Sequence, residues 1–351
     1  MRIAQVAPLA ESVPPLLYGG TERVVSYLTE ELVSLGHEVT LYASGDSQTQ
    51  ARLVAGSPRA LWHDPDIRET LPHHVRLLEL VFRKADQFDV IHFHGDYIHF
   101  PLVRRHSCPN VTTMHGWMHV PDLQPLLDEY REVPLVSISD NQRGPVPRAN
   151  WQATVYHGLP LQLFRFHGKP AGYLAFLGRL SPEKRVDRAI EIALQSDVPL
   201  KIAAKIYPEE REYFKEKIKP LLDASKSLVE YTGEITDREK NEFLGGARAV
   251  LFPIEWPEPF GLVMIEALAC GTPVIAWKRG SVPEVLADGT TGYIVDSVSD
   301  AVAAVKRIDS LSRRKCRQVF EERFSAERMA RDYLQVYERL TAHWSTAGHV
   351  F

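Results

Sequence analysis

Hydrophobic and polar positions along the chain repeat in the order strand, then helix. The apolar run at 2–7 predicts a strand, apolar residues at helical spacing predict a helix over 21–35, and "EVTLYA" at 38–43 predicts another strand. Thr21 is the expected N-cap of that helix, and Gly36 is expected to end it. Strands that alternate with helices in this way indicate a parallel sheet.

The same pattern continues through the first half of the chain. Short β-branched runs at 89–94, 110–115, 134–139 and 153–157 predict strands, and the spacing over 71–86 predicts a helix. Several of these strands end in polar pairs, namely His94-Gly95, His115-Gly116, Ser139-Asp140 and His157-Gly158. Ligands of parallel sheets bind beyond the carboxyl ends of the strands, so these pairs are expected to line one wall of a binding site.

The periodicity lapses over 160–170 and then restarts with a second α/β pattern, which places a domain boundary near residue 168. We therefore expect an N-terminal domain over 1–168, a C-terminal domain over 169–325 and a last helix within 326–351. The predicted fold class is α/β, with two Rossmann-like, doubly wound domains facing across a cleft.

Composition narrows the partners and the compartment. The 351 residues carry 41 Lys and Arg against 45 Asp and Glu, so the chain has no basic footprint for nucleic acid. Cys108, Cys270 and Cys316 are widely spaced and odd in number, which fits free thiols and a cytoplasmic location. No run is long enough to span a membrane. A helix packed on the sheet is favoured for 71–86, and peripheral contact with the inner face of a membrane stays open as the alternative.

The stretch "EPFGLVMIEALACGTPVIA" at 258–276 carries the clearest candidate site. It follows a strand and a Pro-rich loop and predicts a helix closed by Gly271. The backbone amides of Phe260, Gly261 and Leu262 would then be unpaired donors at a helix N-terminus, where phosphate binds readily.

Two carboxylates flank that helix start. Glu258 and Glu266 would lie about 12 Å apart if the segment between them were entirely helical, a span comparable with a diphosphate and its two sugars. The alternative interpretation of Glu266 is an exposed residue of an amphipathic helix. The alternative interpretation of Glu258 is a loop charge that interacts favourably with the helix dipole. The apolar neighbours of Glu266 favour a functional role, because a carboxylate in that setting requires a hydrogen-bond partner.

Cations follow an earlier strand, in the loop "GRLSPEK". Arg179 and Lys184 could neutralise a diphosphate from the side opposite the amides, although a solvated loop is the commoner setting for such residues. Gly19 and Gly20, before the first helix, could bring backbone close to the same phosphates, or could simply form a flexible turn.

Other chemistries lack their motifs. Six histidines lie between 92 and 119, but no HExxH spacing accompanies them, so a metal site ranks below solvated or site-lining histidine. The chain contains no GxSxG motif, which would indicate a hydrolase. No GxGxxG motif follows a strand, as it would in a dehydrogenase.

Taken together, the glycine pair, the Arg and Lys of "GRLSPEK" and the Glu pair of "EPFGLVMIE" resemble the retaining GT-B glycosyltransferases of family 4. The likeness extends over essentially the whole chain, including "GTPVIA", the "GSVPE" turn at 280–284 and "GTTGYIV". It implies transfer of a hexosyl group from a UDP- or GDP-linked sugar to an acceptor hydroxyl of a glycan, lipid or small molecule, without a metal or other cofactor. The N-terminal domain would bind the acceptor and the C-terminal domain the donor, with the backbone around Gly233 and Ile235 as a candidate surface for the nucleoside base.

The resemblance also implies roles for single residues. Arg179 and Lys184 would neutralise the diphosphate, Glu258 would bind hydroxyls of the donor sugar, and Glu266 would bind the ribose. His115 in "TMHGW" would lie beside the transferred sugar, and the last helix would cross back to the first domain.

Two other readings stay open. A non-catalytic or epimerase-like nucleotide-sugar binding protein would share the architecture, whereas a phosphorylase would need a lysine for pyridoxal phosphate that we cannot nominate. The chain also departs from many relatives at Arg185, where they have glycine after the lysine.

Overall fold

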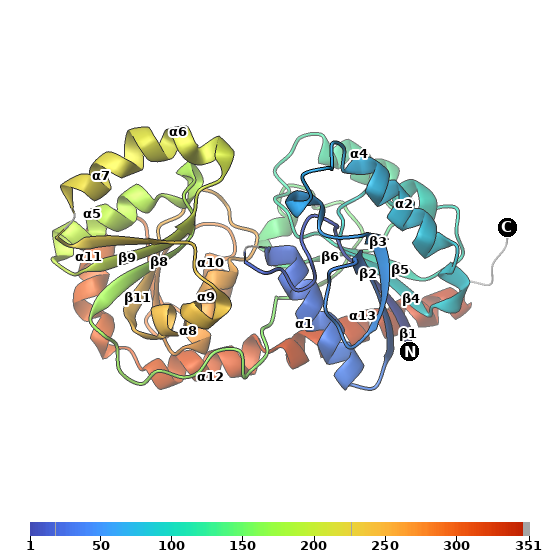
Figure 1. Ribbon diagram of the computed structural model, residues 1–351. Helices are drawn as coiled ribbons and strands as arrows, with labels where there is room; N and C mark the ends of the chain where they lie inside the picture. The colour runs from blue at the N-terminus through green and yellow to red at the C-terminus, as the bar shows by residue number, and fades with distance from the viewer. Residues whose placement is uncertain (18, 226, 347–351) are drawn as a thin grey trace. The chain divides into compact units, whose positions relative to one another are not determined.

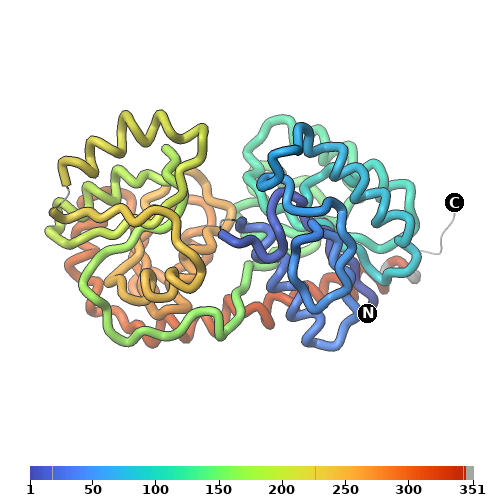
Figure 2. Tube along the Cα trace, viewed as in Figure 1, coloured from blue at the N-terminus to red at the C-terminus, as the bar shows by residue number. Residues whose placement is uncertain are grey.

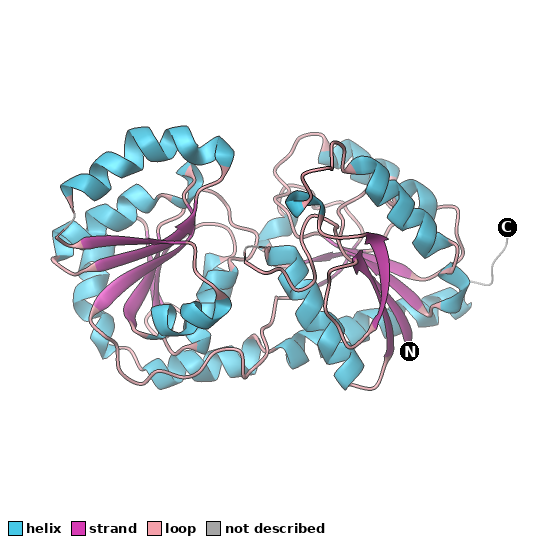
Figure 3. Cartoon of the chain, in the orientation of Figure 1, coloured by secondary structure: helices cyan, strands magenta, loops and turns pink. Residues whose placement is uncertain are grey.

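Two parallel β-sheets organise the chain in a computed structural model that describes residues 1–17, 19–225 and 227–346 (Figures 1 and 3). The first unit comprises Met1–Pro160 with the segment from Ala326 onward, and the second comprises Leu161–Ser325. The first unit thus ends before the boundary predicted near residue 168. The last helix belongs to the first unit, and the acceptor and donor roles of the two domains remain predictions.

The first unit contains a seven-stranded sheet in the order β3-β2-β1-β4-β5-β6-β7. Its strands are β1 (Arg2–Val6), β2 (Glu38–Ser44), β3 (Arg52–Ser57), β4 (Val90–Phe93), β5 (Asn110–Thr113), β6 (Leu135–Ser137) and β7 (Trp151–Thr154). Its helices are α1 (Gly20–Ser34), α2 (Leu71–Phe82), α3 (Phe100–Val103), α4 (Leu123–Glu129) and α13 (Ala326–Thr346), with short turns η1 (Leu61–His63), η2 (Ala85–Gln87) and η3 (Asn141–Arg143). All the strand pairings are parallel, and β1 pairs with both β2 and β4.

Helices cover both faces of this sheet. Apolar residues of α2 and α4 pack with Tyr42 and Phe93 in the main core, whereas Val25 of α1 packs with Leu41 on the other face. Helix α13 lies beside α1, so that the red C-terminal helix runs next to the blue start of the chain (Figure 2).

The second unit contains a six-stranded parallel sheet in the order β10-β9-β8-β11-β12-β13. Its strands are β8 (Tyr173–Arg179), β9 (Leu200–Lys205), β10 (Val229–Gly233), β11 (Ala247–Phe252), β12 (Val274–Trp277) and β13 (Gly292–Val295). Its helices are α5 (Val186–Ser196), α6 (Arg211–Tyr213), the π-helix η6 (Phe214–Ile218), α7 (Lys219–Ala224), α8 (Asp237–Gly245), α9 (Leu262–Ala269), α10 (Val282–Val285), α11 (Val298–Arg307) and α12 (Arg313–Arg323), with turns η4 (Pro182–Lys184), η5 (Pro208–Glu210) and η7 (Ile308–Ser310). Residues of α5 and α11 pack on β8, β9 and β11 in its core.

Several predicted boundaries are wrong by a few residues, for local reasons. Thr21 is not the N-cap of α1, because the helix already begins at Gly20 and its N-cap is Gly19. Helix α2 ends at Phe82, and the expected continuation to Asp86 forms the separate turn η2. Among the described residues, no helix is long and apolar enough to cross a membrane.

The core of the first unit encloses histidines that are neutral. Burial lowers the pKa of His99 to about 3, and its Nε2 lies 2.7 Å from the hydroxyl of Thr112. Burial also lowers the pKa of His92 well below its ordinary value. The unfolded chain binds protons at these sites below about pH 6.5, whereas the folded chain does not. The free energy of unfolding therefore falls as the pH drops from about 6.5 toward 3.

We predict that His99→Gln removes part of this acid sensitivity. The free energy of unfolding of the first unit should fall less steeply below pH 6, by up to about 1.4 kcal/mol per pH unit relative to the wild type. Native-state hydrogen exchange of the β4 and β5 amides between pH 5 and 6.5 measures this slope. His119→Gln, at an exposed position, is the matched control substitution. Identical slopes for the wild type and His99→Gln would contradict the prediction.

Candidate functional site

The order of the second sheet reverses between β8 and β11, which are neighbours at its centre. Loops that leave the carboxyl ends of two such strands diverge and leave room for a ligand. Arg179 is the last residue of β8, and Lys184 ends the turn that follows. Glu258 lies in the loop after β11. Three of the predicted site residues therefore meet at the switch point of this sheet.

An ion pair joins the two loops. The ammonium of Lys184 donates to Oε2 of Glu258, and both side chains are largely buried, at 14% and 12% exposure. The indole Nε1 of Trp256 donates to the same carboxylate oxygen at 2.8 Å, and the lysine nitrogen lies 5.1 Å from the Trp256 ring centroid. The sequence did not identify Trp256 as a site residue, although Trp256 lies only two residues before Glu258.

Arg179 is held by carboxylates of its own neighbourhood. Its Nη2 donates to Glu183 Oε1 at 2.7 Å, and Ser181 donates to the same oxygen at 2.6 Å. Glu210 lies 3.6 Å from Nε of Arg179. Burial acts to raise the pKa of Glu183, but hydrogen bonds from Ser181, the backbone and Arg179 outweigh it, so that the pKa is lowered. Both predicted cations of the site are thus already paired.

The backbone of the Glu258 loop is fixed by the predicted "GSVPE" turn. The amide of Ser281 donates to the Glu258 carbonyl at 3.0 Å, and its hydroxyl donates to the Phe260 carbonyl at 2.7 Å. Gly280 has φ +53°, and a Cβ at this position would lie 2.3 Å from the backbone carbonyl oxygen of Glu258. Only glycine allows this approach, so Gly280 and Ser281 set where Glu258 stands.

Glu266 lies inside α9 and is buried, with its side chain 6% exposed. The exposed alternative is therefore excluded. Its partner is Lys240 of α8, whose ammonium lies 3.1 Å from Oε1 of Glu266 and 3.3 Å from Asp237. The helix starts only at Leu262, so the estimate of 12 Å between the two glutamates, which assumed a continuous helix, does not apply.

The start of α9 differs slightly from the expectation. Gly261 is its N-cap, with φ +79°, and a Cβ there would lie 2.9 Å from Met264 Cε. Leu262 is the first helical residue, whereas Phe260 precedes the helix and is buried. Gly233 ends β10 with φ +81°, and Ile235 follows it, half-buried, in the loop before α8.

Arg185, named above as a departure from the family pattern, follows the turn η4 and adopts the left-handed conformation, with φ 54° and ψ 48°. Its guanidinium pairs with Asp187 at 2.8 Å and with Glu255 at 2.9 Å. The departure in sequence therefore leaves the backbone in a glycine-like conformation that the two ion pairs hold.

His115, in the first unit, belongs to a hydrogen-bonded network built on β1, β4 and β5. Oε1 of Gln5 lies 2.7 Å from His94 Nε2, and His94 Nδ1 lies 2.9 Å from His115 Nε2. Nε2 of Gln5 donates to the Tyr337 hydroxyl at 3.1 Å, which in turn lies 2.7 Å from His92 Nδ1. The last helix thus contributes directly to the network.

The network sets the tautomer of His115. An amide oxygen only accepts, so His94 carries its proton on Nε2 and accepts at Nδ1 from Nε2–H of His115. Burial lowers the pKa of His115 to about 3, so the ring is neutral and its lone pair is at Nδ1. That nitrogen is buried and lacks a hydrogen-bond partner within the described part of the chain. Gln5 and His94 were not predicted to act in this way.

Gly19 and Gly20 also lie in the first unit, at the start of α1. A Cβ on Gly19 would lie 2.7 Å from Pro15 Cβ, which gives this glycine a packing role. Gly20 is exposed as the first residue of the helix. Across residues 1–17, 19–225 and 227–346, no group of three or more His, Cys, Asp or Glu side chains is placed to hold a metal ion.

Two doubly wound parallel units, with an ion-paired cation and carboxylate at the switch point of the second, define a GT-B-type protein. A protein-family model described as "Glycosyltransferase Family 4" matches residues 18–179. A second family model, described as "Glycosyl transferases group 1", matches residues 164–328. The chain belongs to this family, as the sequence motifs predicted.

Individual proteins agree with this assignment. An uncharacterized 41.2 kDa protein in the cps region of Klebsiella pneumoniae is 31% identical over 47% of this chain and 46% of its own length, so the match spans about half of that relative. The crystal structure of AviGT4, a glycosyltransferase involved in avilamycin A biosynthesis, has a TM-score of 0.77 at 24% identity and covers 97% of this chain and 98% of its own. Anabaena HepE in complex with UDP has a TM-score of 0.75 at 16% identity over 97% of this chain and 100% of its own. These structures confirm the fold.

We predict that Gly280→Ala displaces the Glu258 loop and lowers the free energy of unfolding by about 3 kcal/mol, because it adds a backbone clash to a strained φ. Gly289→Ala is the matched control, since Gly289 has φ +69° but no atom within 4 Å of an added Cβ, and should cost about 1 kcal/mol. Urea unfolding measures both. Equal losses would show that the contact with Glu258 is not what requires glycine.

We further predict that Arg185→Gly is about 1 kcal/mol more stable than Arg185→Ala. Both variants lose the ion pairs with Asp187 and Glu255, but only the alanine retains the left-handed strain. Urea unfolding of the two variants side by side measures the difference. An alanine variant as stable as the glycine variant would contradict the strain.

Proposed function

We propose that this chain is a retaining glycosyltransferase that moves a hexosyl group from a UDP- or GDP-linked sugar to an acceptor hydroxyl. The observation that carries the proposal is the pairing of Lys184 with Glu258 across the switch point of the second sheet, with Arg179 at the end of the adjoining strand. A diphosphate requires cations there, and a sugar requires a carboxylate that accepts from its hydroxyls.

The roles follow the growth of charge during bond breaking. Negative charge develops on the leaving diphosphate. Arg179, Lys184 and the backbone amide of Leu262, in the first turn of α9, would stabilise this charge. No step calls for a metal or other cofactor, because protein cations supply the positive charge. The leaving phosphate would assist deprotonation of the acceptor hydroxyl on the same face of the sugar, which gives retention.

The existing ion pairs shape donor binding. Glu183 holds Arg179 and Glu258 holds Lys184, so an incoming diphosphate would share or replace these carboxylates. Lys184 would then interact with the phosphate in addition to Glu258. The Glu258 carboxylate would thereby become available to accept hydrogen bonds from hydroxyls of the sugar. Glu266 would accept from the ribose hydroxyls while Lys240 balances its charge.

The first unit would provide the acceptor site and His115. Its neutral ring, fixed by His94 and Gln5, fits the place beside the transferred sugar that family resemblance assigns to it. The structure of HepE with UDP supports testing UDP first. Burial raises the pKa of three free thiols, those of Cys108, Cys270 and Cys316, to about 12. Such unreactive thiols are compatible with the proposed cytoplasmic location.

The test separates the roles of the two glutamates. We predict that Glu266→Ala weakens UDP or GDP binding about tenfold or more, through loss of a charged hydrogen-bond acceptor. We expect Glu258→Ala to lower turnover about a hundredfold and to leave nucleotide affinity nearly unchanged. Calorimetry with UDP and GDP measures affinity, and nucleoside diphosphate release from a panel of nucleotide sugars measures turnover.

Glu216→Ala, at an exposed position of the same unit, is the control and should alter neither quantity. Absence of binding by both nucleotides would refute the transferase. Nucleotide binding without release from any donor, with acceptors supplied, would favour the non-catalytic binding protein instead. Equal losses of nucleotide affinity in both variants would contradict the division of roles.

A further inference from the structure

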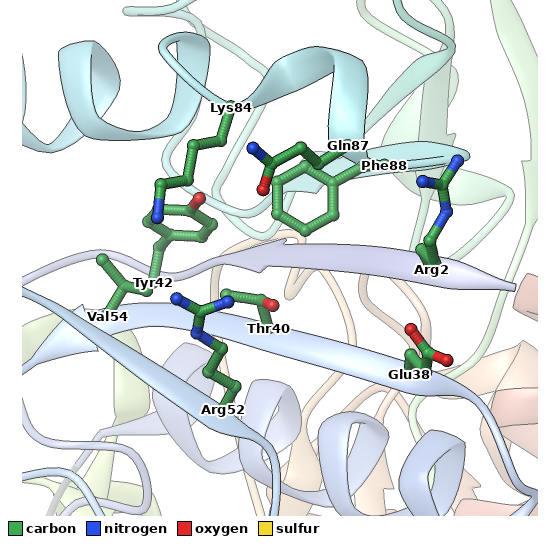
Figure 4. A pocket seen from close by; sticks show the side chains of 9 residues that line it. All are labelled: Arg2, Glu38, Thr40, Tyr42, Arg52, Val54, Lys84, Gln87 and Phe88. Carbon is green, nitrogen blue, oxygen red and sulfur yellow. The ribbon is translucent and has the colours of Figure 1, made fainter.

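A polar pocket lies in the first unit, against β1, β2 and β3 (Figure 4). It has a volume of about 300 Å³. Its walls come from the three strands and from the segment around η2, and they are formed by Arg2, Glu38, Thr40, Tyr42, Arg52, Val54, Lys84, Gln87 and Phe88. None of these residues has a role in the proposed transfer reaction.

Tyr42 gives the pocket an unsatisfied donor. Its side chain is fully buried, and its hydroxyl has no hydrogen-bond partner within residues 1–17, 19–225 and 227–346. Its ring contacts Phe88 edge-on, with the centroids 6.1 Å apart, so the orientation of the hydroxyl is fixed. A buried hydroxyl without a partner costs about 1–3 kcal/mol, which a bound acceptor would recover.

The cations of the pocket are unequally compensated. Arg2 is held by Asp89 through two side-chain hydrogen bonds, of 2.8 and 3.2 Å. Arg52 and Lys84 have no ion-pair or hydrogen-bond partner for their side chains among the residues that the structure describes. Glu38 is the single carboxylate in the lining. Two available cations and a neutral hydroxyl donor therefore surround a space with one negative charge at its edge.

This site is distinct from the histidine network of the same unit. Arg2, Glu38 and Arg52 are the first residues of β1, β2 and β3. His94 and His115 instead follow the carboxyl ends of β4 and β5. Tyr42 packs with Phe93 in the main core, and successive residues of a strand point to opposite faces of the sheet, so Tyr42 and His94 lie on opposite faces.

We propose that this pocket binds a small sugar phosphate, with the phosphate on Arg52, Lys84 and the Tyr42 hydroxyl and the sugar hydroxyls toward Glu38 and Thr40. Phosphate suits the first three groups because it is doubly charged and accepts at several oxygens, and a guanidinium binds two of them at once. The volume exceeds the needs of a lone phosphate, since it equals the share of about ten waters. Glu38, which would repel a phosphate, accepts hydrogen bonds from hydroxyls.

The probes are glucose 6-phosphate, inorganic phosphate and glucose, titrated into the full chain by calorimetry in the presence of saturating UDP. UDP occupies the donor site of the proposed function, so it prevents that site from being counted. We predict saturable binding of glucose 6-phosphate, weaker binding of inorganic phosphate and none of glucose. Arg52→Gln should weaken glucose 6-phosphate binding about tenfold or more, and Tyr42→Phe several-fold.

Arg68→Gln, an exposed arginine of the same unit, is the control and should bind as the wild type does. The proposal is overturned if glucose 6-phosphate fails to saturate, if UDP displaces it, or if inorganic phosphate binds as tightly. It is equally overturned if both Arg52→Gln and Tyr42→Phe bind normally. Circular dichroism of each variant shows that the fold is retained, and Arg52→Gln changes only an exposed side chain.

Discussion

The ion pair between Lys184 and Glu258 is the interaction on which the candidate site depends. It joins the loops after β8 and β11 at the one place in the sheet where the strand order reverses. Two largely buried charges are stable there only because each satisfies the other, and Trp256 adds a further donor to the carboxylate. The pair therefore links the two loops at the switch point.

The same electrostatic principle recurs at Glu266, where Lys240 plays the corresponding part. In both places a largely buried carboxylate and a lysine compensate each other's charge. The ligands of the proposed function would therefore compete with these ion pairs.

The hydrophobic pattern predicted the alternation of strands and helices and the parallel sheets, because burial of both sheet faces imposes long apolar runs, whereas the family followed from the motifs. It also marked Glu266 as unusual among Ile265 and Ala267. The pattern could not name Lys240 as its partner, since that contact depends on how α8 packs against α9. Thr21 was mistaken for the N-cap because local preference favours threonine there, whereas the close packing of Gly19 on Pro15 decided the start of α1.

The two polar groups on the N-terminal sheet, the histidines and the pocket around Tyr42, show why prediction from local sequence was uneven. The histidines after β4 and β5 were visible as polar residues at strand ends, but their hydrogen-bonded network includes Gln5 and Tyr337, and Tyr337 belongs to a helix more than two hundred residues away. Arg2 and Arg52 were unremarkable in sequence because strand starts are commonly charged, and Lys84 was unremarkable because it follows the end of α2. Only the fold places them around the buried hydroxyl of Tyr42. That hydroxyl lacks a hydrogen-bond partner in the described part of the chain, and this, rather than the basic residues themselves, distinguishes the proposed binding pocket from a solvated edge.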